Sequence, residues 1–180
     1  MFVRVALCFF ILILRLELGH ARNNYEIIMN NLKCRAVKPS AITEMTCILH
    51  RKRIPIVAGR FILNETFHQF DIHSEFDLFK KDNTRMNVAE LKMDGCKYLS
   101  SMYENNILGK LFRRFRKATN LPSGCPILKG KLYEIRNYTF RSDEYPPNVP
   151  QAKWQVRTRL LRREEVFVEI LLEGELVYNT

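Results

Sequence analysis

The clearest alternation of hydrophobic and polar positions runs over residues 70–78. Hydrophobic side chains alternate there with acidic and polar ones, and Ser74 falls on the hydrophobic side. A period of two is typical of a β-strand with one dry face and one wet face. We therefore expect a strand over 70–78 with an acidic outer face, followed by a turn at residues 81–83.

Six further segments have the hydrophobic, branched and aromatic composition of strands. They are residues 25–34, 42–49, 61–63, 132–140, 154–160 and 166–172. The last two alternate clearly, and residues 161–165 between them are the expected turn, although they contain no Gly, Asn or Pro. Several short strands with one helix predict a mostly β protein built as an antiparallel sandwich.

One segment has the spacing of an amphipathic helix. Ser101 and Glu104 fit a capping box before it, and Asn120 and Pro122 are stop signals after it. The hydrophobic face is formed by Ile107, Leu108, Leu111, Phe112 and Phe115. The other face is a basic surface formed by Lys110, Arg113, Arg114, Arg116 and Lys117. Three interpretations of this basic surface are open. It is a solvated face, it contacts anionic lipid headgroups or a membrane surface, or it contacts heparin or nucleic acid.

The N-terminus is typical of a secretory signal peptide. Arg4 precedes an apolar run over residues 5–14, and Gly19 and Ala21 have the small-residue spacing of a cleavage site. A membrane anchor is the alternative, but a spanning helix needs ~20 apolar residues. We expect residues 1–21 to be the signal peptide and residues 22–180 to be a single secreted domain.

Cleavage simplifies the composition. The chain has 180 residues, five cysteines and a net charge of +10. Two arginines, one glutamate and Cys8 lie in the signal, so the remaining chain carries +9 and four cysteines. An even number in a secreted chain predicts two disulfides. Three pairings are open, and we favour Cys34 with Cys47 and Cys96 with Cys125, because these close loops of modest length.

The remaining chemistry points away from catalysis. The cysteines lack C-x-x-C spacing, which disfavours zinc, and no hydrolase, metalloprotease or phosphate-loop motif is present. His68 and His73 could serve a nuclease, and Asp71, His73 and Asp77 could imitate a metal site, but side chains two apart on a wet strand face are common by chance. We expect no enzyme, no metal and no cofactor. Secretion also disfavours nucleic acid as a partner.

Sequons at Asn64 and Asn137 are candidate glycosylation sites.

Several motifs together resemble a known family. They are Asn31-Leu32-Lys33-Cys34, Cys47-Ile48-Leu49, Arg85-Met86-Asn87, Asp94-Gly95-Cys96-Lys97-Tyr98-Leu99, Asn120 and Cys125-Pro126-Ile127. Their order resembles a domain-of-unknown-function family of secreted insect proteins that includes the CheB chemosensory proteins. That family is similar to the ML lipid-recognition superfamily, which includes the ganglioside-activator protein and the Niemann-Pick type C sterol carrier.

The resemblance implies an immunoglobulin-like sandwich whose sheets admit a lipid, and for some members a role in chemosensation. The chain would then be a carrier or co-receptor for a lipid or hydrocarbon-like ligand. Candidate cavity residues on the hydrophobic strand faces are Phe70, Ile72, Phe76, Leu78, Trp154, Val156, Val168 and Ile170. The alternative is a structural or interaction module without a cavity, which docks an acidic receptor or glycan through its basic surface.

The signal peptide gives a first prediction. N-terminal sequencing of the protein secreted from eukaryotic cells should begin at Arg22, because cleavage follows Ala21. An intact Met1 on the secreted protein would contradict it.

Overall fold

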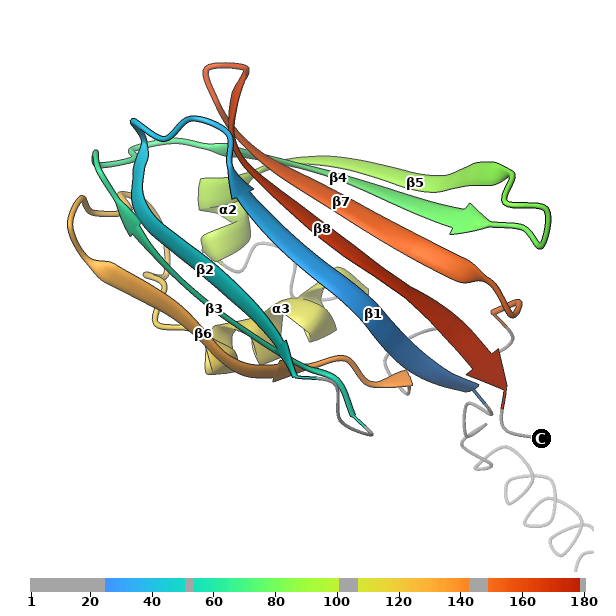
Figure 1. The fold of residues 1–180 in the computed structure, drawn as a ribbon. Helices are drawn as coiled ribbons and strands as arrows, with labels where there is room; N and C mark the ends of the chain where they lie inside the picture. Colours follow the sequence, from blue (N-terminus) through green and yellow to red (C-terminus); the bar gives the residue numbers. More distant parts are fainter. Residues whose placement is uncertain (1–24, 51–53, 101–106, 143–148, 179–180) are drawn as a thin grey trace, which may run out of the picture.

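In the part of the chain that the structure describes, eight strands form two antiparallel sheets that face one another (Figure 1). The structure is a computed structural model, and it describes residues 25–50, 54–100, 107–142 and 149–178. One sheet has five strands in the order β1-β8-β7-β4-β5, and the other has three in the order β2-β3-β6. The strands are β1 (Tyr25–Ala36), β2 (Ile42–His50), β3 (Ile56–Leu63), β4 (Asp71–Phe79), β5 (Arg85–Asp94), β6 (Leu132–Thr139), β7 (Lys153–Arg162) and β8 (Glu165–Tyr178). The prediction of a mostly β antiparallel sandwich is confirmed.

All the predicted strands are present, and several are longer than expected. β8 extends to Tyr178, and β3 begins before Gly59, which pairs with Cys47 inside the sheet. β5 is the strand that the pattern analysis does not predict. Asn87 and Ala89 pair with neighbouring residues of β4, so Val88 is an extra residue in a β-bulge. The bulge shifts the hydrophobic period by one residue and hides the strand from a search for regular alternation.

Two helices follow β5. α3 (Ile107–Ala118) confirms the predicted helix, and the predicted capping box at Ser101 and Glu104 lies outside the described residues. Asn120 ends this segment as predicted, because its side chain donates to the carbonyl of Leu132 and accepts from the amide of Glu134. Neither helix in the described ranges is long and apolar enough to cross a membrane.

The short helix α2 (Gly95–Leu99) explains the Asp-Gly-Cys motif. Asp94 caps it, because its side-chain Oδ1 accepts from the backbone amides of Cys96 and Lys97 at 2.8 and 3.0 Å. A Cβ atom on Gly95 would lie 2.2 Å from the ring of Phe70, so no larger residue fits without displacing that ring. Cys96 then stands on α2 in position to form its disulfide.

The two disulfides have the favoured sequential pairing. Cys34 on β1 is bonded to Cys47 on β2, and Cys96 on α2 is bonded to Cys125. The first bond joins the two sheets directly along one edge, since β1 and β2 belong to different sheets. The second connects the helix after β5 to the segment before β6, and therefore ties the sheets indirectly along the other edge.

The turn between β7 and β8 is a two-residue turn without glycine. Arg162 pairs with Glu165, and the two residues between them, Arg163 and Glu164, have φ values of 50° and 68°. Positive φ at both positions is the conformation of a type I′ hairpin turn, which Asn and Gly normally occupy. A side chain in this region costs roughly 1–2 kcal/mol per residue.

We expect Glu164→Gly to raise the free energy of unfolding by about 0.5–1 kcal/mol, because glycine adopts positive φ without steric cost. Urea denaturation with the disulfides intact measures it. Glu164→Ala is the matched control, which removes the same charge and should give no gain. An equal gain in both variants would contradict the backbone explanation.

Candidate functional site

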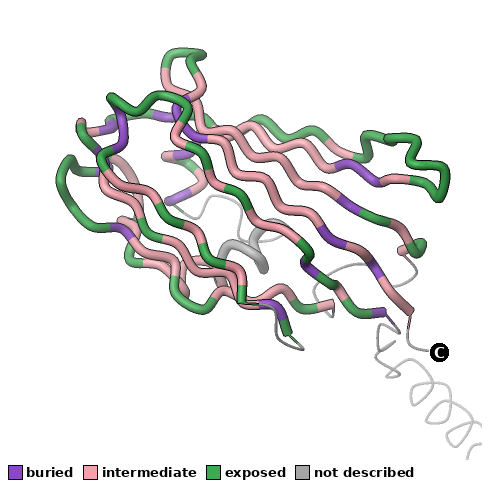
Figure 2. The backbone as a smooth tube through the Cα atoms, viewed as in Figure 1, coloured by how far each residue is buried: buried purple, intermediate pink, exposed green. Residues whose placement is uncertain are grey.

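Buried residues form two separate cores, and Figure 2 shows where these residues lie along the backbone. The first core lies where β4 and β8 begin, and it contains Ala41, Ile42, Leu63, Phe67, Phe70, Leu99, Ile127, Tyr133, Phe167 and Val168. The second core lies where β4 and β8 end, and it contains Tyr25, Met29, Leu78, Trp154 and Leu176. Buried hydrophobic residues are therefore concentrated toward the two ends of the sandwich.

Between the two cores, the inner face of the five-stranded sheet is only half-buried. Strand pairing places two rows of side chains there, which we call the central rows. They consist of Phe76, Val156, Leu172 and Leu32, and of Ser74, Thr158, Ile170 and Cys34. All eight residues keep intermediate exposure, although β7 and β8 are interior strands of the sheet. In a closed sandwich such positions would be buried against the facing sheet.

The facing three-stranded sheet has a glycine in its middle strand at the same level. Cys47 pairs with Gly59, and Gly59 pairs with Ile135, so these residues form the matching row of the three-stranded sheet. The Cys34–Cys47 disulfide sets this row opposite the central rows. Because Gly59 has no side chain, the middle strand of the facing sheet adds no bulk to the interior there.

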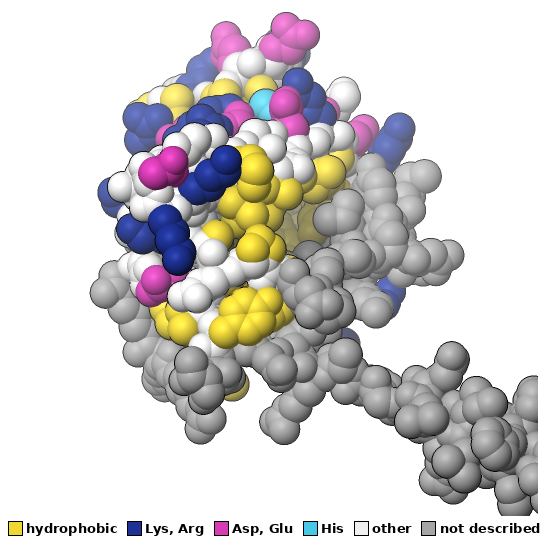
Figure 3. Space-filling model, turned by 90° about the vertical axis from the view of Figure 1, so that its right-hand side faces the viewer, with side chains coloured by type: hydrophobic (Ala, Val, Ile, Leu, Met, Phe, Trp, Pro, Cys, Tyr) yellow, Lys and Arg dark blue, Asp and Glu magenta, His cyan; other side chains and the backbone are white. Residues whose placement is uncertain are grey.

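The interior is open on the side of β5. Five strands face three, so the inner face of β4 and β5 extends beyond the smaller sheet. Met86 and Leu91 pair with Leu78 and Ser74 and so share that inner face, yet they are 43% and 37% exposed. Figure 3 views the molecule from the side where β4 and β8 end, and it shows hydrophobic side chains gathered around a recess there.

Aromatic residues line the opposite rim of the opening, along α3 and β6. The ring of Phe115 lies 6.5 Å from that of Tyr98 and 6.2 Å from that of Tyr138, which in turn lies 4.9 Å from the ring of Phe140. Burial, with the nearby Tyr138 as the smaller cause, raises the pKa of Tyr98 to about 12. Tyr98 therefore stays uncharged at neutral pH.

The predicted cavity residues share one inner face but divide into two groups. Phe70, Val168, Leu78 and Trp154 are buried in the two cores, whereas Ile72, Phe76, Val156 and Ile170 are half-buried. The strand pattern does not single out Leu32 or Leu172, although both stand in the central rows. Leu172 was visible as part of an alternating strand, while Leu32 is displaced by a bulge between Met29 and Asn31.

The predicted basic surface needs correction at two positions. Arg116 is half-buried and donates to the carbonyls of Leu121 and Pro122 at 2.8 and 2.7 Å. Arg114 is also half-buried, donates to the Thr139 hydroxyl and stacks 5.9 Å from the ring centre of Tyr138. These two arginines hold the helix against its surroundings. The exposed members are Arg113 and Lys117, and the side chain of Lys110 lies outside the described part.

Both sequon asparagines are exposed. Asn64 follows β3 and donates to the carbonyl of Ser40 at 3.1 Å. Asn137 lies in an irregular part of β6 with a φ of 52°. Glycosylation at either position stays a prediction.

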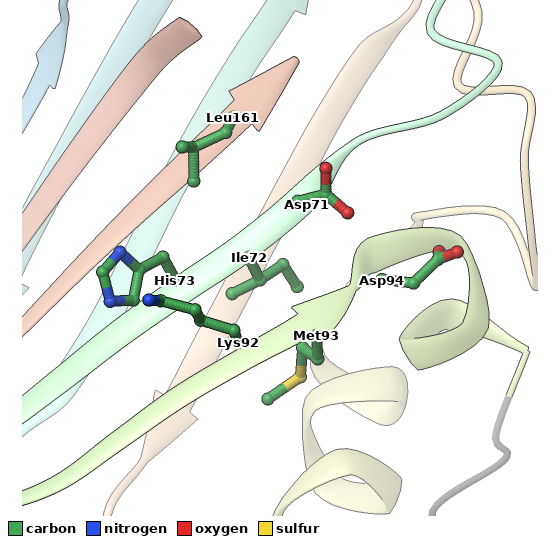
Figure 4. Close-up of a pocket in the computed structure, with 7 residues that line it drawn as sticks. All are labelled: Asp71, Ile72, His73, Lys92, Met93, Asp94 and Leu161. Carbon is green, nitrogen blue, oxygen red and sulfur yellow. The ribbon is translucent and has the colours of Figure 1, made fainter. Parts of the chain in front are cut away.

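A separate pocket of about 360 Å³ lies at the beginning of β4, near the end of β5 (Figure 4). It is lined by Asp71, Ile72, His73, Lys92, Met93, Asp94 and Leu161. His73 Nε2 and Lys92 Nζ each lie 2.9 Å from the same Glu90 carboxylate oxygen. Within the described ranges, no three His, Cys, Asp or Glu side chains gather closely enough to hold a metal ion.

Asp77, expected on a wet acidic face, is instead fully buried. Its carboxylate lies 2.8 Å from Arg85 and accepts from the side-chain amide of Asn87 at 2.9 Å. Burial by itself raises the pKa of Asp77, but the hydrogen bonds from Arg85 and Asn87 and the charges of Arg85 and Arg157 outweigh it and lower the pKa below its usual value. The outer face of this strand is therefore a packed ion-pair network at this point.

Comparison with known proteins gives one family match. Residues 74–156 match a family described as a protein of unknown function, DUF1091. The matched stretch runs from β4 to β7 and contains both helices, the Cys96–Cys125 disulfide and most of the motifs that carry the family resemblance. None of the curated proteins matches this chain.

Two solved structures are distantly similar. Chicken MD-1 complexed with lipid IVa is 13% identical, with 86% of this chain and 98% of that chain covered and a TM-score of 0.40. A Niemann-Pick type C2 protein from Japanese carpenter ant is 10% identical, with 83% and 92% covered and a TM-score of 0.35. The fold given above rests on the strand order and register of this chain.

The lowered pKa of Asp77 predicts a pH dependence. A carboxylate whose pKa is lower in the folded than in the unfolded protein adds stability above the unfolded pKa, and this stability is lost as the pH falls toward the folded value. Asp77→Asn should lower the free energy of unfolding at pH 7 by about 1–3 kcal/mol and weaken its fall between pH 5 and pH 2. Urea denaturation across this range measures both effects, with Asp71→Asn on the exposed start of the same strand as the control. An unchanged pH profile in Asp77→Asn would contradict the prediction.

Proposed function

We propose that this protein is a non-enzymatic carrier or co-receptor that binds a lipid or another hydrocarbon-like ligand between its two sheets. One observation carries the proposal: the central rows are half-buried between two closed cores. Contact with water is unfavourable for an apolar inner surface that the protein leaves uncovered. A ligand that covers it recovers roughly 25 cal/mol for each Å² of apolar surface removed from water.

The chemistry of the central rows selects an apolar ligand. Phe76, Val156 and Leu172 offer hydrocarbon surface without charge, and the charged side chains of the same strands point to the outer face. Each methylene of a bound chain contributes roughly 0.8 kcal/mol on transfer from water. A long hydrocarbon therefore binds here by contact alone, and the open side next to β5 gives it a route of entry.

We further propose that the protein is secreted and acts in chemosensation. The signal-like N-terminus and two disulfides support an extracellular location. The motifs that resemble the CheB proteins support a chemosensory role, and most of them fall inside the matched family region. The exposed Arg113 and Lys117 on α3 would meet anionic headgroups if the ligand is loaded from a membrane, or an acidic patch on a receptor.

Filling the central rows tests the proposal. Val156→Phe and Leu172→Phe should each weaken binding of a fluorescent fatty-acid probe by about tenfold or more, because each ring displaces two or more methylenes of the ligand. Both variants should keep the free energy of unfolding within about 0.5 kcal/mol of the original, since on this proposal the rings enter the space that the ligand would occupy. Ile48→Phe, at a position that is 50% exposed in β2 of the smaller sheet, is the matched control and should change neither quantity.

A closed interaction module would respond in the opposite way. Overpacking a filled core costs typically 1–3 kcal/mol, so Val156→Phe would then destabilise the protein, and the original protein would not bind the probe. Binding of an acidic partner that weakens steeply with salt, without probe binding, would favour the module that docks through a basic surface.

A further inference from the structure

Trp154 occupies a special place on the inner face. It is the single tryptophan of the chain, it is 7% exposed, and it stands in the second core next to the central rows. Along β7 it comes two residues before Val156, so both side chains point to the same inner face. Its ring lies over Gly174, where an added Cβ atom would come within 2.5 Å of the indole. The glycine thus makes room for an indole at one end of the half-buried region.

The indole nitrogen has no hydrogen-bond partner. Among the described residues, the buried side-chain atoms without a partner are Trp154 Nε1 and Asp77 Oδ2, and the latter lies 2.8 Å from the guanidinium of Arg85. Trp154 Nε1 has no such compensating charge. A buried indole N–H is normally paired, and leaving it unpaired costs free energy, so an orphaned one indicates a partner that is supplied from outside the chain.

The described surroundings of the indole are mainly apolar. The other buried members of the second core are Tyr25, Met29, Leu78 and Leu176, and Tyr178, which packs against this core, donates its hydroxyl proton to the carbonyl of Val149. The half-buried Val156 and Leu172 pack against the same core from the side of the central rows. A ligand that fills the central rows would reach the indole by displacing these two neighbours.

A second polar site on the inner face is a pair of hydroxyl groups. Ser74 and Thr158 stand in the central rows, and their hydroxyl oxygens are 2.9 Å apart, so one donates to the other. Thr158 is four residues from Trp154 along β7, which corresponds to roughly 13 Å in an extended strand. Among the described residues, the inner face thus carries the unpaired indole N–H at its end and a hydroxyl pair in its middle, in which the accepting hydroxyl keeps a proton that it can donate.

We propose that the ligand is an oxygenated lipid, whose hydroxyl, carbonyl or ester oxygen accepts a hydrogen bond from Trp154 Nε1, and that its hydrocarbon part lies along the central rows. This inference rests on the proposed function and adds the chemical class and the orientation of the ligand. The oxygen is placed at the end of the ligand that reaches the second core. A saturated hydrocarbon would bind more weakly, because it leaves the indole N–H unpaired.

The test compares two ligands of equal chain length, heptadecane and 2-heptadecanone, on delipidated protein. Displacement of a fluorescent fatty-acid probe gives both affinities, and the single indole N–H resonance in a ¹H–¹⁵N spectrum reports hydrogen bonding directly. We expect 2-heptadecanone to bind about tenfold more tightly and to move the indole proton downfield. Heptadecane should leave that proton where it is. Because this spectrum is recorded on the original protein, its result does not depend on whether a substituted protein folds.

Two variants locate the effect. Trp154→Phe removes the N–H but keeps an aromatic ring, and it should bind both ligands with equal affinity. Thr158→Val removes a hydroxyl at nearly constant volume and should preserve the preference for the ketone. Equal affinities in the original protein, an unmoved indole resonance, or a preference that survives in Trp154→Phe or disappears in Thr158→Val would overturn the inference. Binding of neither ligand nor probe would overturn the proposed function, and the inference with it.

Discussion

The two disulfides set the spacing of the two sheets, and the rest of the interior depends on that spacing. Cys34–Cys47 joins β1 to β2 at the level of the central rows, and Cys96–Cys125 joins α2 to the segment that leads into β6. The sheets are thereby held along both edges, one directly and one through a helix. Large side chains at the two ends fill the space between the sheets, whereas Gly59 in the middle of the facing sheet has no side chain to do so.

The two cores and the central rows have different roles, because the cores stabilise the fold and the central rows are the proposed binding surface. The two cores bury aromatic and aliphatic side chains at the ends and supply the folding free energy. The central rows contribute less to folding, and a bound ligand would complete them and stabilise the folded state by mass action. The arginines of α3 that contact carbonyls and Tyr138 support the same division, because they anchor the helix beside the opening without filling it.

Regular periodicity predicts much of this protein, and each miss has a physical cause. The strand face from Phe70 to Leu78 and the helix at residues 107–118 follow from spacing. The sequential disulfides are favoured among three open pairings, because their loops are of modest length, and the structure has this pairing. β5 escapes because a bulge at Val88 breaks its period. Alternation places Phe76 and Leu78 on one face, but it does not predict their burial. Phe76 is half-buried and Leu78 is buried, because burial depends on how far the facing sheet covers each position. Asp77 is misjudged for a similar reason: Arg85 and Asn87, which cover it, come from the strand that periodicity misses.

The same bulge also bears on how a sandwich with an open side avoids aggregation. β5 is an edge strand of the larger sheet, and its backbone could in principle pair with a strand of another molecule. An extra residue at Val88 interrupts the even spacing of donors and acceptors that such pairing needs, and Arg85, Glu90 and Lys92 place charges along the strand. The hydrophobic opening is thus bordered by an edge that is a poor template for cross-molecule β-sheet growth, so the inner face can remain accessible to a small ligand without recruiting another chain.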